Sequence, residues 1–126
     1  MARLRILIHV HDTFKPQACD VAIVHPTSHA SLARAFLQEF TADRDLLDCV
    51  QYHDEGYALW RQWRHRGSYR EERLQALFQV IRDWDLFLAF CVLDGCTAGK
   101  SREPLGWFLE LVTPRVSSRV GPDWIL

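Results

Sequence analysis

Several familiar signatures are absent from this sequence. It has no glycine-rich P-loop and no dinucleotide-binding fingerprint, so nucleotide binding through either motif is disfavoured. It also has no internal repeat of the kind that builds repeat architectures. Its four cysteines form no C-x-x-C pair, and no apolar run is long enough to span a bilayer. With no evident signal peptide either, the pattern predicts a protein of the reducing cytoplasm that makes no membrane contact.

An excess of charge of one sign is also lacking. The net charge is −1, from 15 basic and 16 acidic residues, which disfavours a long nucleic acid or an anionic membrane as a partner. Lysine is rare, since thirteen of the basic residues are arginines and the two lysines are Lys15 and Lys100. Both lysines fall beside acidic and histidine motifs, so a local phosphate site remains compatible with the sequence.

The residues that are abundant predict a packed interior. Apolar residues make up 48% and aromatic residues 12% of the 126 positions, enough for one hydrophobic core without disulfides. We therefore expect a single domain over residues 1–126, with its core in residues 4–112 and an irregular tail over residues 113–126.

The apolar periodicity predicts mainly helices. Residues 4–11 are compatible with a buried strand or with part of a helix, and residues 13–26 are expected to form a connecting loop. A helical stripe follows Thr27 or Ser28 as the N-cap and ends near Thr41. The next helix begins after an acidic start and carries His53 late.

Three more helices are predicted in the second half. A capping-box pattern from Ser68 to Glu71 precedes a helix that reaches Ile81. Residues 84–93 are almost continuously apolar and predict a central buried helix. Ser101 is expected to cap the last helix. The predicted fold is all-α, a compact helical domain of about five to six helices.

Five residues are candidates to bind a divalent metal. Neutral imidazoles and carboxylates are common ligands of Zn, Mn and Fe, and a carboxylate can bridge two ions. In a helix, Lys15 would lie four residues from His11 and so near the same face. The candidates stand at separate places along the chain: His11, Asp12, His29, His53 and Asp94.

The order of these residues resembles that of the HD-domain superfamily. The similarity rests on a His-Asp pair followed by a lysine, two separate histidines and a late aspartate with basic residues behind it, and it covers roughly residues 4–112. The matching positions are His11-Asp12 with Lys15, His29 opening a helix, Val50-Gln51-Tyr52-His53, and Leu93-Asp94-Gly95-Cys96 with Lys100 and Arg102.

This resemblance implies a metal-dependent phosphohydrolase that acts on a nucleotide or another small phosphate ester. One or two divalent ions, among Mn, Zn, Fe, Mg and Ni, would activate a water. Asp12 would hold or bridge the metal, and Lys15, Lys100 and Arg102 would neutralise phosphate charge. Asp54 is a candidate to position the water, with a solvated charge at a helix end as the competing interpretation.

One departure from the family pattern leaves alternatives open. The superfamily has a further histidine about one helix before its His-Asp pair, whereas His9, two residues before His11, would point to another helical face. The alternatives are an HD-type di-iron oxygenase and a noncatalytic metal- or ligand-binding module. A longer natural chain, or a homodimer through apolar surface near residues 4–8, would cover the start of the domain.

Overall fold

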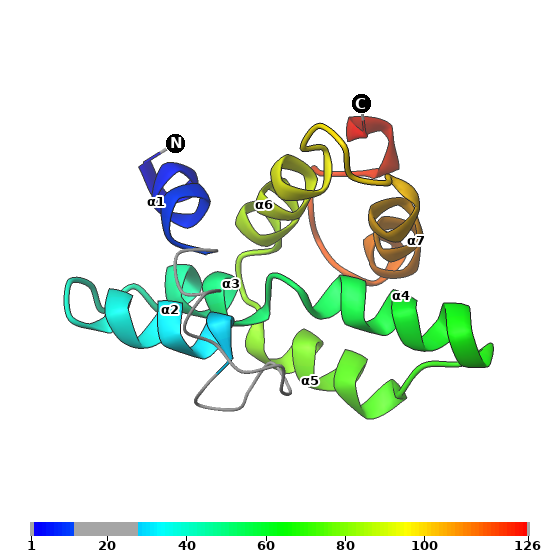
Figure 1. Ribbon diagram of the computed structural model, residues 1–126, viewed down its shortest axis with the longest axis horizontal. Helices are drawn as coiled ribbons and strands as arrows, with labels where there is room; N and C mark the ends of the chain where they lie inside the picture. The colour runs from blue at the N-terminus through cyan, green and yellow to red at the C-terminus, as the bar shows by residue number, and fades with distance from the viewer. Residues whose placement is uncertain (1, 12–27, 126) are drawn as a thin grey trace. The chain divides into compact units, whose positions relative to one another are not determined.

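The computed structural model describes residues 2–11 and 28–125, and this part of the chain is all-helical (Figure 1). The predicted all-α class is thereby confirmed. The described residues divide into two compact units, called unit 1 (Met1–Asp54) and unit 2 (Glu55–Leu126), which are considered separately below. The predicted loop over residues 13–26 lies outside the described residues.

Unit 1 contains three described α-helices: α1 (Ala2–Val10), α2 (His29–Gln38) and α3 (Arg44–Tyr52). The caps of α2 and α3 follow from local chemistry. The side chain of Ser28 accepts a hydrogen bond from the Ser31 N–H at 3.1 Å, and that of Asp43 accepts one from the Leu46 N–H at 3.2 Å. Of the two predicted N-cap residues, Thr27 and Ser28, the cap is Ser28. The ambiguity over residues 4–11 resolves in favour of helix.

Polar contacts fix how the helices of unit 1 pair. Arg34 on α2 lies 2.7 Å from Asp48 on α3, and Gln51 donates to the Ser31 hydroxyl at 2.9 Å. These pairs set α2 and α3 antiparallel in one register. Arg3 near the start of α1 contacts Asp43 at 3.0 Å, so α1 and α3 begin side by side. Buried apolar residues fill the space between the helices, among them Leu7, Ala33, Leu37, Leu46 and Val50.

Unit 2 contains four α-helices, α4 (Glu55–Arg66), α5 (Glu71–Val80), α6 (Trp84–Gly95) and α7 (Glu103–Val112), and two short 3-10 helices, η2 (Thr113–Arg115) and η3 (Pro122–Trp124). The buried helix predicted over residues 84–93 is α6. Ser68 does not cap α5, since Arg70 stands at the N-cap without a side-chain bond. Arg102 precedes α7, although the Ser101 hydroxyl still accepts the Glu103 N–H at 3.2 Å.

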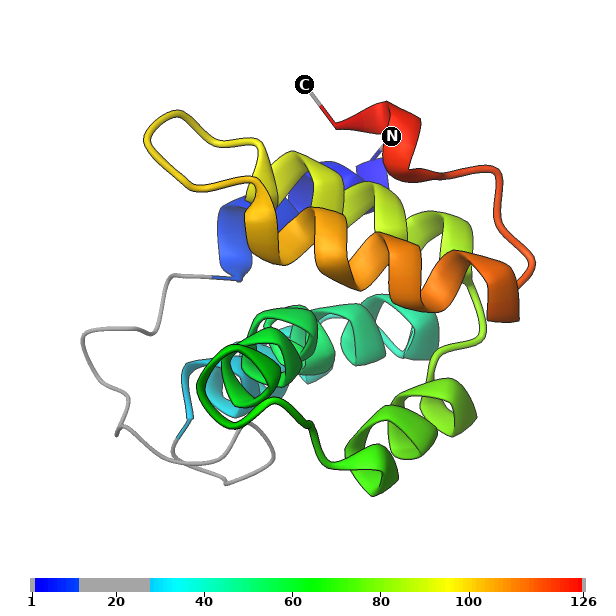
Figure 2. The same cartoon turned by 90° about the vertical axis from the view of Figure 1, so that its right-hand side faces the viewer.

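The core of unit 2 is aromatic and aliphatic. Helices α6 and α7 lie side by side (Figure 2), and the Phe87 and Phe108 rings lie 6.4 Å apart between their centroids. Helix α7 also packs closely on α4, because a Cβ built on Gly56 would lie 2.7 Å from Cγ of Phe108. Glycine at position 56 therefore permits a helix contact that a larger residue would obstruct.

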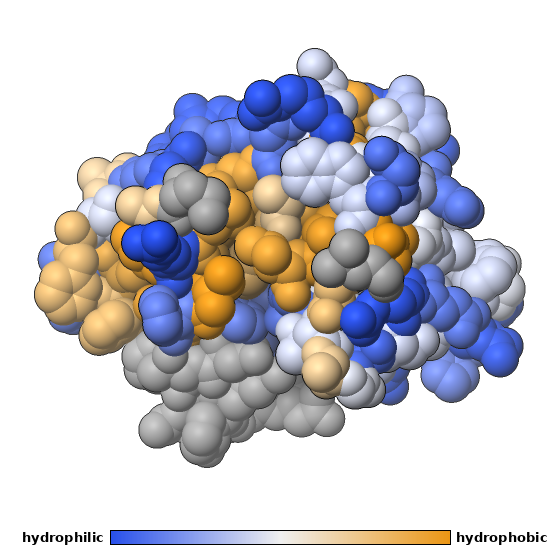
Figure 3. Space-filling view, turned by 90° about the horizontal axis from the view of Figure 1, so that it is seen from above, coloured by the Kyte–Doolittle hydropathy of each residue, from blue (hydrophilic) through white to orange (hydrophobic). Residues whose placement is uncertain are grey.

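Apolar side chains also reach the surface, and the face drawn in Figure 3 shows hydrophobic areas beside hydrophilic ones. In α1, Ile6 is 40% exposed and Ile8 is 45% exposed, whereas Leu7 is fully buried. The expected homodimer through this segment stays a prediction. Among the described helices, none has the length and apolar character needed to cross a membrane.

Candidate metal centre

The pairing of α2 with α3 brings three candidate side chains together. His29 is the first residue of α2, and His53 caps the C-terminal end of α3, directly before Asp54. His29 and His53 continue the antiparallel register set by the Arg34–Asp48 and Ser31–Gln51 pairs. Residues 24 positions apart in the sequence are thus neighbours at one end of the helix pair.

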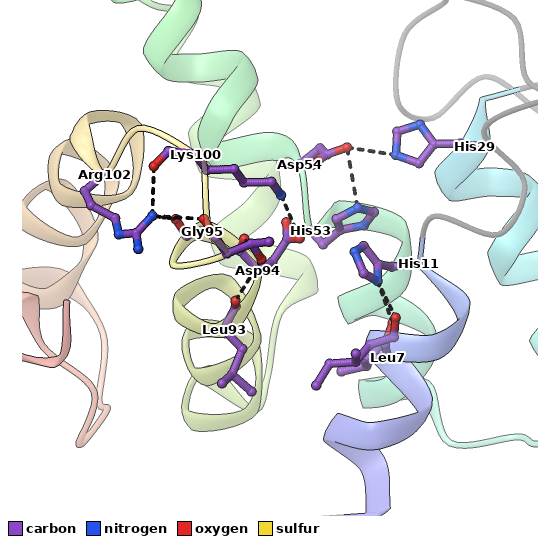
Figure 4. A network of polar contacts seen from close by, with 12 residues as sticks. Leu7, His11, His29, His53, Asp54, Leu93, Asp94, Gly95, Lys100 and Arg102 are labelled. Atoms are coloured by element: carbon purple, nitrogen blue, oxygen red, sulfur yellow. Dashed lines mark hydrogen bonds and ion pairs between the residues drawn. The ribbon is translucent and has the colours of Figure 1, made fainter. Parts of the chain in front are cut away.

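These three residues form a compact donor group. One ligand atom from each of His29, His53 and Asp54 lies within 4.8 Å of the other two. Asp54 Oδ2 lies 2.8 Å from Nε2 of His29 and 3.4 Å from Nε2 of His53 (Figure 4). The His53 side chain is 2% exposed, while those of His29 and Asp54 are 23% and 37% exposed. The group is therefore buried at His53 and accessible to solvent at His29 and Asp54.

The hydrogen bonds of His53 fix which of its ring nitrogens can bind a cation. Nδ1 lies 2.8 Å from the Val50 carbonyl oxygen, which can only accept, so Nδ1 carries the proton. In a neutral imidazole the lone pair is then on Nε2, which faces Asp54 Oδ2. A proton or a metal ion between these two acceptors would stabilise their close approach.

His11 presents a similar arrangement next to His53. Its Nδ1 lies 2.9 Å from the Leu7 carbonyl oxygen and 3.0 Å from that of Ile8, so this nitrogen donates and Nε2 is the ligand-capable atom. The His11 and His53 ring centroids lie 5.2 Å apart, with the rings nearly perpendicular. Since α1 and α3 begin together, both helices bring a histidine to their C-terminal ends.

The remaining predicted site residues lie elsewhere or are not described. Asp12 and Lys15 lie outside the described residues. In unit 2, Asp94 Oδ1 pairs with Lys100 Nζ at 3.0 Å near the end of α6. The Arg102 guanidinium donates to four backbone carbonyls between Gly95 and Lys100, at 2.8 to 3.4 Å. These contacts give Arg102 a structural role in the turn that links α6 to α7.

The donor set suits some metals better than others. Two or three imidazole nitrogens with one carboxylate oxygen are typical ligands of Zn, Fe, Mn and Ni, whereas Mg prefers oxygen ligands and water. Ligands about 2.0–2.2 Å from one ion lie roughly 3.0–3.5 Å apart, close to the two distances made by Asp54 Oδ2. The residues of unit 1 therefore fit a transition-metal ion.

Asp54 is the one residue of this group that the sequence does not predict as a metal ligand. Its adjacency to His53 was the available signal, but an aspartate at a helix end is usually solvated. Comparison of the chain with protein-family models, with curated proteins and with solved structures finds no match in any of the three. The geometry of unit 1 is therefore the main basis for a functional proposal.

Proposed function

We propose that unit 1 binds a divalent transition-metal ion through His29, His53 and Asp54, with His11 as a further ligand, and that the protein is a metal-dependent phosphohydrolase. The observation that carries the proposal is the convergence of three ligand atoms within 4.8 Å. The proposed substrate is a small phosphate ester or nucleotide.

The same geometry suggests a different placement of the HD pattern on this chain. His53 and Asp54 are themselves a His-Asp pair, and His29 lies one helix upstream of them. With this placement the upstream histidine of the superfamily is present. His11 then becomes an additional ligand.

Each side chain has a defined task in this proposal. The Val50 carbonyl holds the His53 ring so that Nε2 faces Asp54. The carbonyls of Leu7 and Ile8 hold the His11 ring through its Nδ1, which leaves Nε2 as its ligand atom. Asp54 balances the charge of the bound cation and is exposed enough to meet a substrate. When bound, the ion would supply a Lewis acid that activates water at neutral pH.

A second candidate function is a noncatalytic metal-binding module. It is favoured by the contacts of two residues expected to bind phosphate. Lys100 pairs with Asp94, and the Arg102 guanidinium is taken up by backbone carbonyls. Both cations therefore already have partners within unit 2, and these contacts do not depend on a phosphate.

A hydrolysis assay on metal-loaded protein separates the two functions. The protein is loaded in turn with Zn, Mn, Fe and Ni and tested with aryl phosphates, phosphodiesters and nucleoside monophosphates. We expect metal-dependent release of phosphate or alcohol that His29→Ala and Asp54→Asn abolish. Asp123→Asn, which removes an exposed carboxylate outside both proposed sites, should leave it unchanged. Stoichiometric metal binding with no hydrolysis of any class would reject the enzyme and retain the binding module.

A further inference from the structure

Unit 2 contains a cationic groove that takes no part in the proposed metal site. It has a volume of about 420 Å³ and is lined by residues of α4 and α5: Ala58, Arg61, Gln62, His65, Arg66 and Arg73. Its volume lies within the range of pockets for small ligands, roughly 300–1,000 Å³. Three of its six lining residues are arginines and none is acidic, so its chemistry is that of an anion site.

The arginines of the groove have little negative charge to neutralise them. Within unit 2, Glu55 forms an ion pair with Arg73, using Nε and Nη2 of the guanidinium and leaving Nη1 outside the pair. No described carboxylate forms an ion pair with Arg61 or Arg66. Two full positive charges therefore line the groove without an acidic partner.

Several of these donors are held in place before a ligand arrives. Glu55 is 4% exposed and accepts hydrogen bonds from Arg73. The Arg73 guanidinium is therefore already ordered and would lose little conformational entropy on binding a ligand. The Arg61 guanidinium lies over the Tyr57 ring, 5.9 Å from its centroid. Gln62 Oε1 accepts a hydrogen bond from the Arg70 N–H at 2.9 Å. This contact fixes the Gln62 amide, whose Nε2 can donate to other partners.

We infer that the groove between α4 and α5 binds the phosphate group of a small anionic ligand, separately from the metal centre. A lining of N–H donors matches the acceptor oxygens of phosphate, and arginine can contact two of them at once. The volume leaves room beyond one phosphate group, which favours an organic phosphate or a diphosphate over the bare ion.

Basic residues at the end of a helix have a simpler explanation, since they interact favourably with the helix dipole. Arg64, His65 and Arg66 all lie in the last turn of α4 and share this effect. Arg64, however, does not line the groove. Arg64 is therefore a matched control, since it carries the same charge, is also exposed and lies in the same helix turn as Arg66.

The test is a calorimetric titration with inorganic pyrophosphate. We expect saturable binding at a single site, weakened about 10-fold or more by Arg61→Gln or Arg66→Gln, because each removes a charged hydrogen-bond donor. Arg64→Gln should change the affinity less than about 2-fold, as expected for an exposed charge outside the groove. Circular dichroism would verify that each exposed-site variant is folded.

Three outcomes would overturn the inference. The first is the absence of saturable pyrophosphate binding to the folded wild-type protein. The second is an equal loss for Arg64→Gln and Arg66→Gln, which would indicate general surface attraction, and the third comes from the metal centre. Repeating the titration with Asp54→Asn tests whether pyrophosphate binding requires the metal centre. Binding that persists in wild type but disappears in this variant would place the anion at the metal instead.

Discussion

Both units have apolar cores, but they differ in how much polar pairing joins their helices. In unit 1, α2 and α3 are joined by an ion pair and a side-chain hydrogen bond, Arg34–Asp48 and Gln51–Ser31. In unit 2, α4, α6 and α7 meet through apolar contacts that include Gly56, Phe87 and Phe108. Directional polar pairs specify a register residue by residue, whereas apolar packing tolerates small shifts. Unit 2 also has a buried polar pair, Glu55–Arg73 between α4 and α5, but in unit 1 the polar pairs continue in register to His29 and His53.

The largest effect is expected in the apolar core of unit 2. Phe87 is 1% exposed and packs against the rings of Trp84 and Phe108. Phe87→Ala should lower the free energy of unfolding by about 3–5 kcal/mol, measured by denaturant titration. Phe40→Ala is the control in unit 1, since Phe40 is 71% exposed and should change stability by less than about 0.5 kcal/mol. Similar losses in both variants would contradict the assigned core.

The next largest effect is expected at the polar pairing of unit 1. Asp48→Asn removes the charge that faces Arg34, and the side chain of Asp48 is 5% exposed. We expect a loss of about 2–3 kcal/mol, somewhat below that of a fully buried pair because the Arg34 side chain is 24% exposed. Metal affinity should fall too, because this pair sets the register of His29 and His53. Unchanged affinity would break the proposed link between polar pairing and the metal centre.

A smaller effect should follow from crowding the contact of α4 with α7. Gly56→Ala would place Cβ 2.7 Å from Cγ of Phe108, so the helices must move apart, at a cost of about 1–2 kcal/mol. Gly106→Ala is the matched control, because its Cβ would meet its nearest neighbour at an ordinary 3.6 Å. Thermal unfolding of the two variants makes the comparison. A more stable Gly56→Ala protein would contradict the close packing.

The smallest effect concerns pH and the cap of α3. Burial raises the pKa of Asp43, but hydrogen bonds from the Leu46 N–H and Arg3 outweigh it, so the pKa lies below the ordinary 3.8. The charged form therefore stabilises the folded state above about pH 3.8, and this contribution is lost as the pH falls through the lower folded-state pKa.

Asp43→Asn keeps a capping side chain and removes the charge. It should lower stability at neutral pH by less than about 1 kcal/mol, because the Asp43 side chain is 35% exposed and screened by solvent. Urea titrations of both proteins between neutral and acid pH measure the difference. A stability gap that stays constant or widens at acid pH would contradict the assigned shift.

The sequence predicts best what depends on neighbouring residues. Ser28 caps α2, and the continuous apolar run that predicts a buried helix is α6, because caps and apolar runs act locally. Ser68 fails as a cap because the N-cap of α5 is Arg70, two residues later. Residues 55–66, for which no separate helix is predicted, form α4.

The candidate site was predictable in part for the same reason. The sequence predicts His11, His29 and His53 as metal ligands, and in unit 1 the ring of His53 lies beside those of His11 and His29. The sequence predicts that Asp54 positions a water and does not predict it as a metal ligand. The residues next to Asp54 in the sequence do not reveal that its Oδ2 lies near the imidazoles of both His29 and His53. This proximity depends on the α2–α3 register, which side chains such as Arg34 and Asp48 set over a distance in sequence that periodicity does not report.

The most direct test of the central claim is a titration of the metal-free protein with Zn and Co, compared with Asp54→Asn. This substitution preserves size and removes the carboxylate that contacts His29 and His53. The account predicts stoichiometric binding, with Co absorption bands typical of nitrogen and oxygen ligands, and an affinity at least about 10- to 100-fold lower in the variant. Equal affinities for a folded variant, or no binding by the wild type, would contradict it.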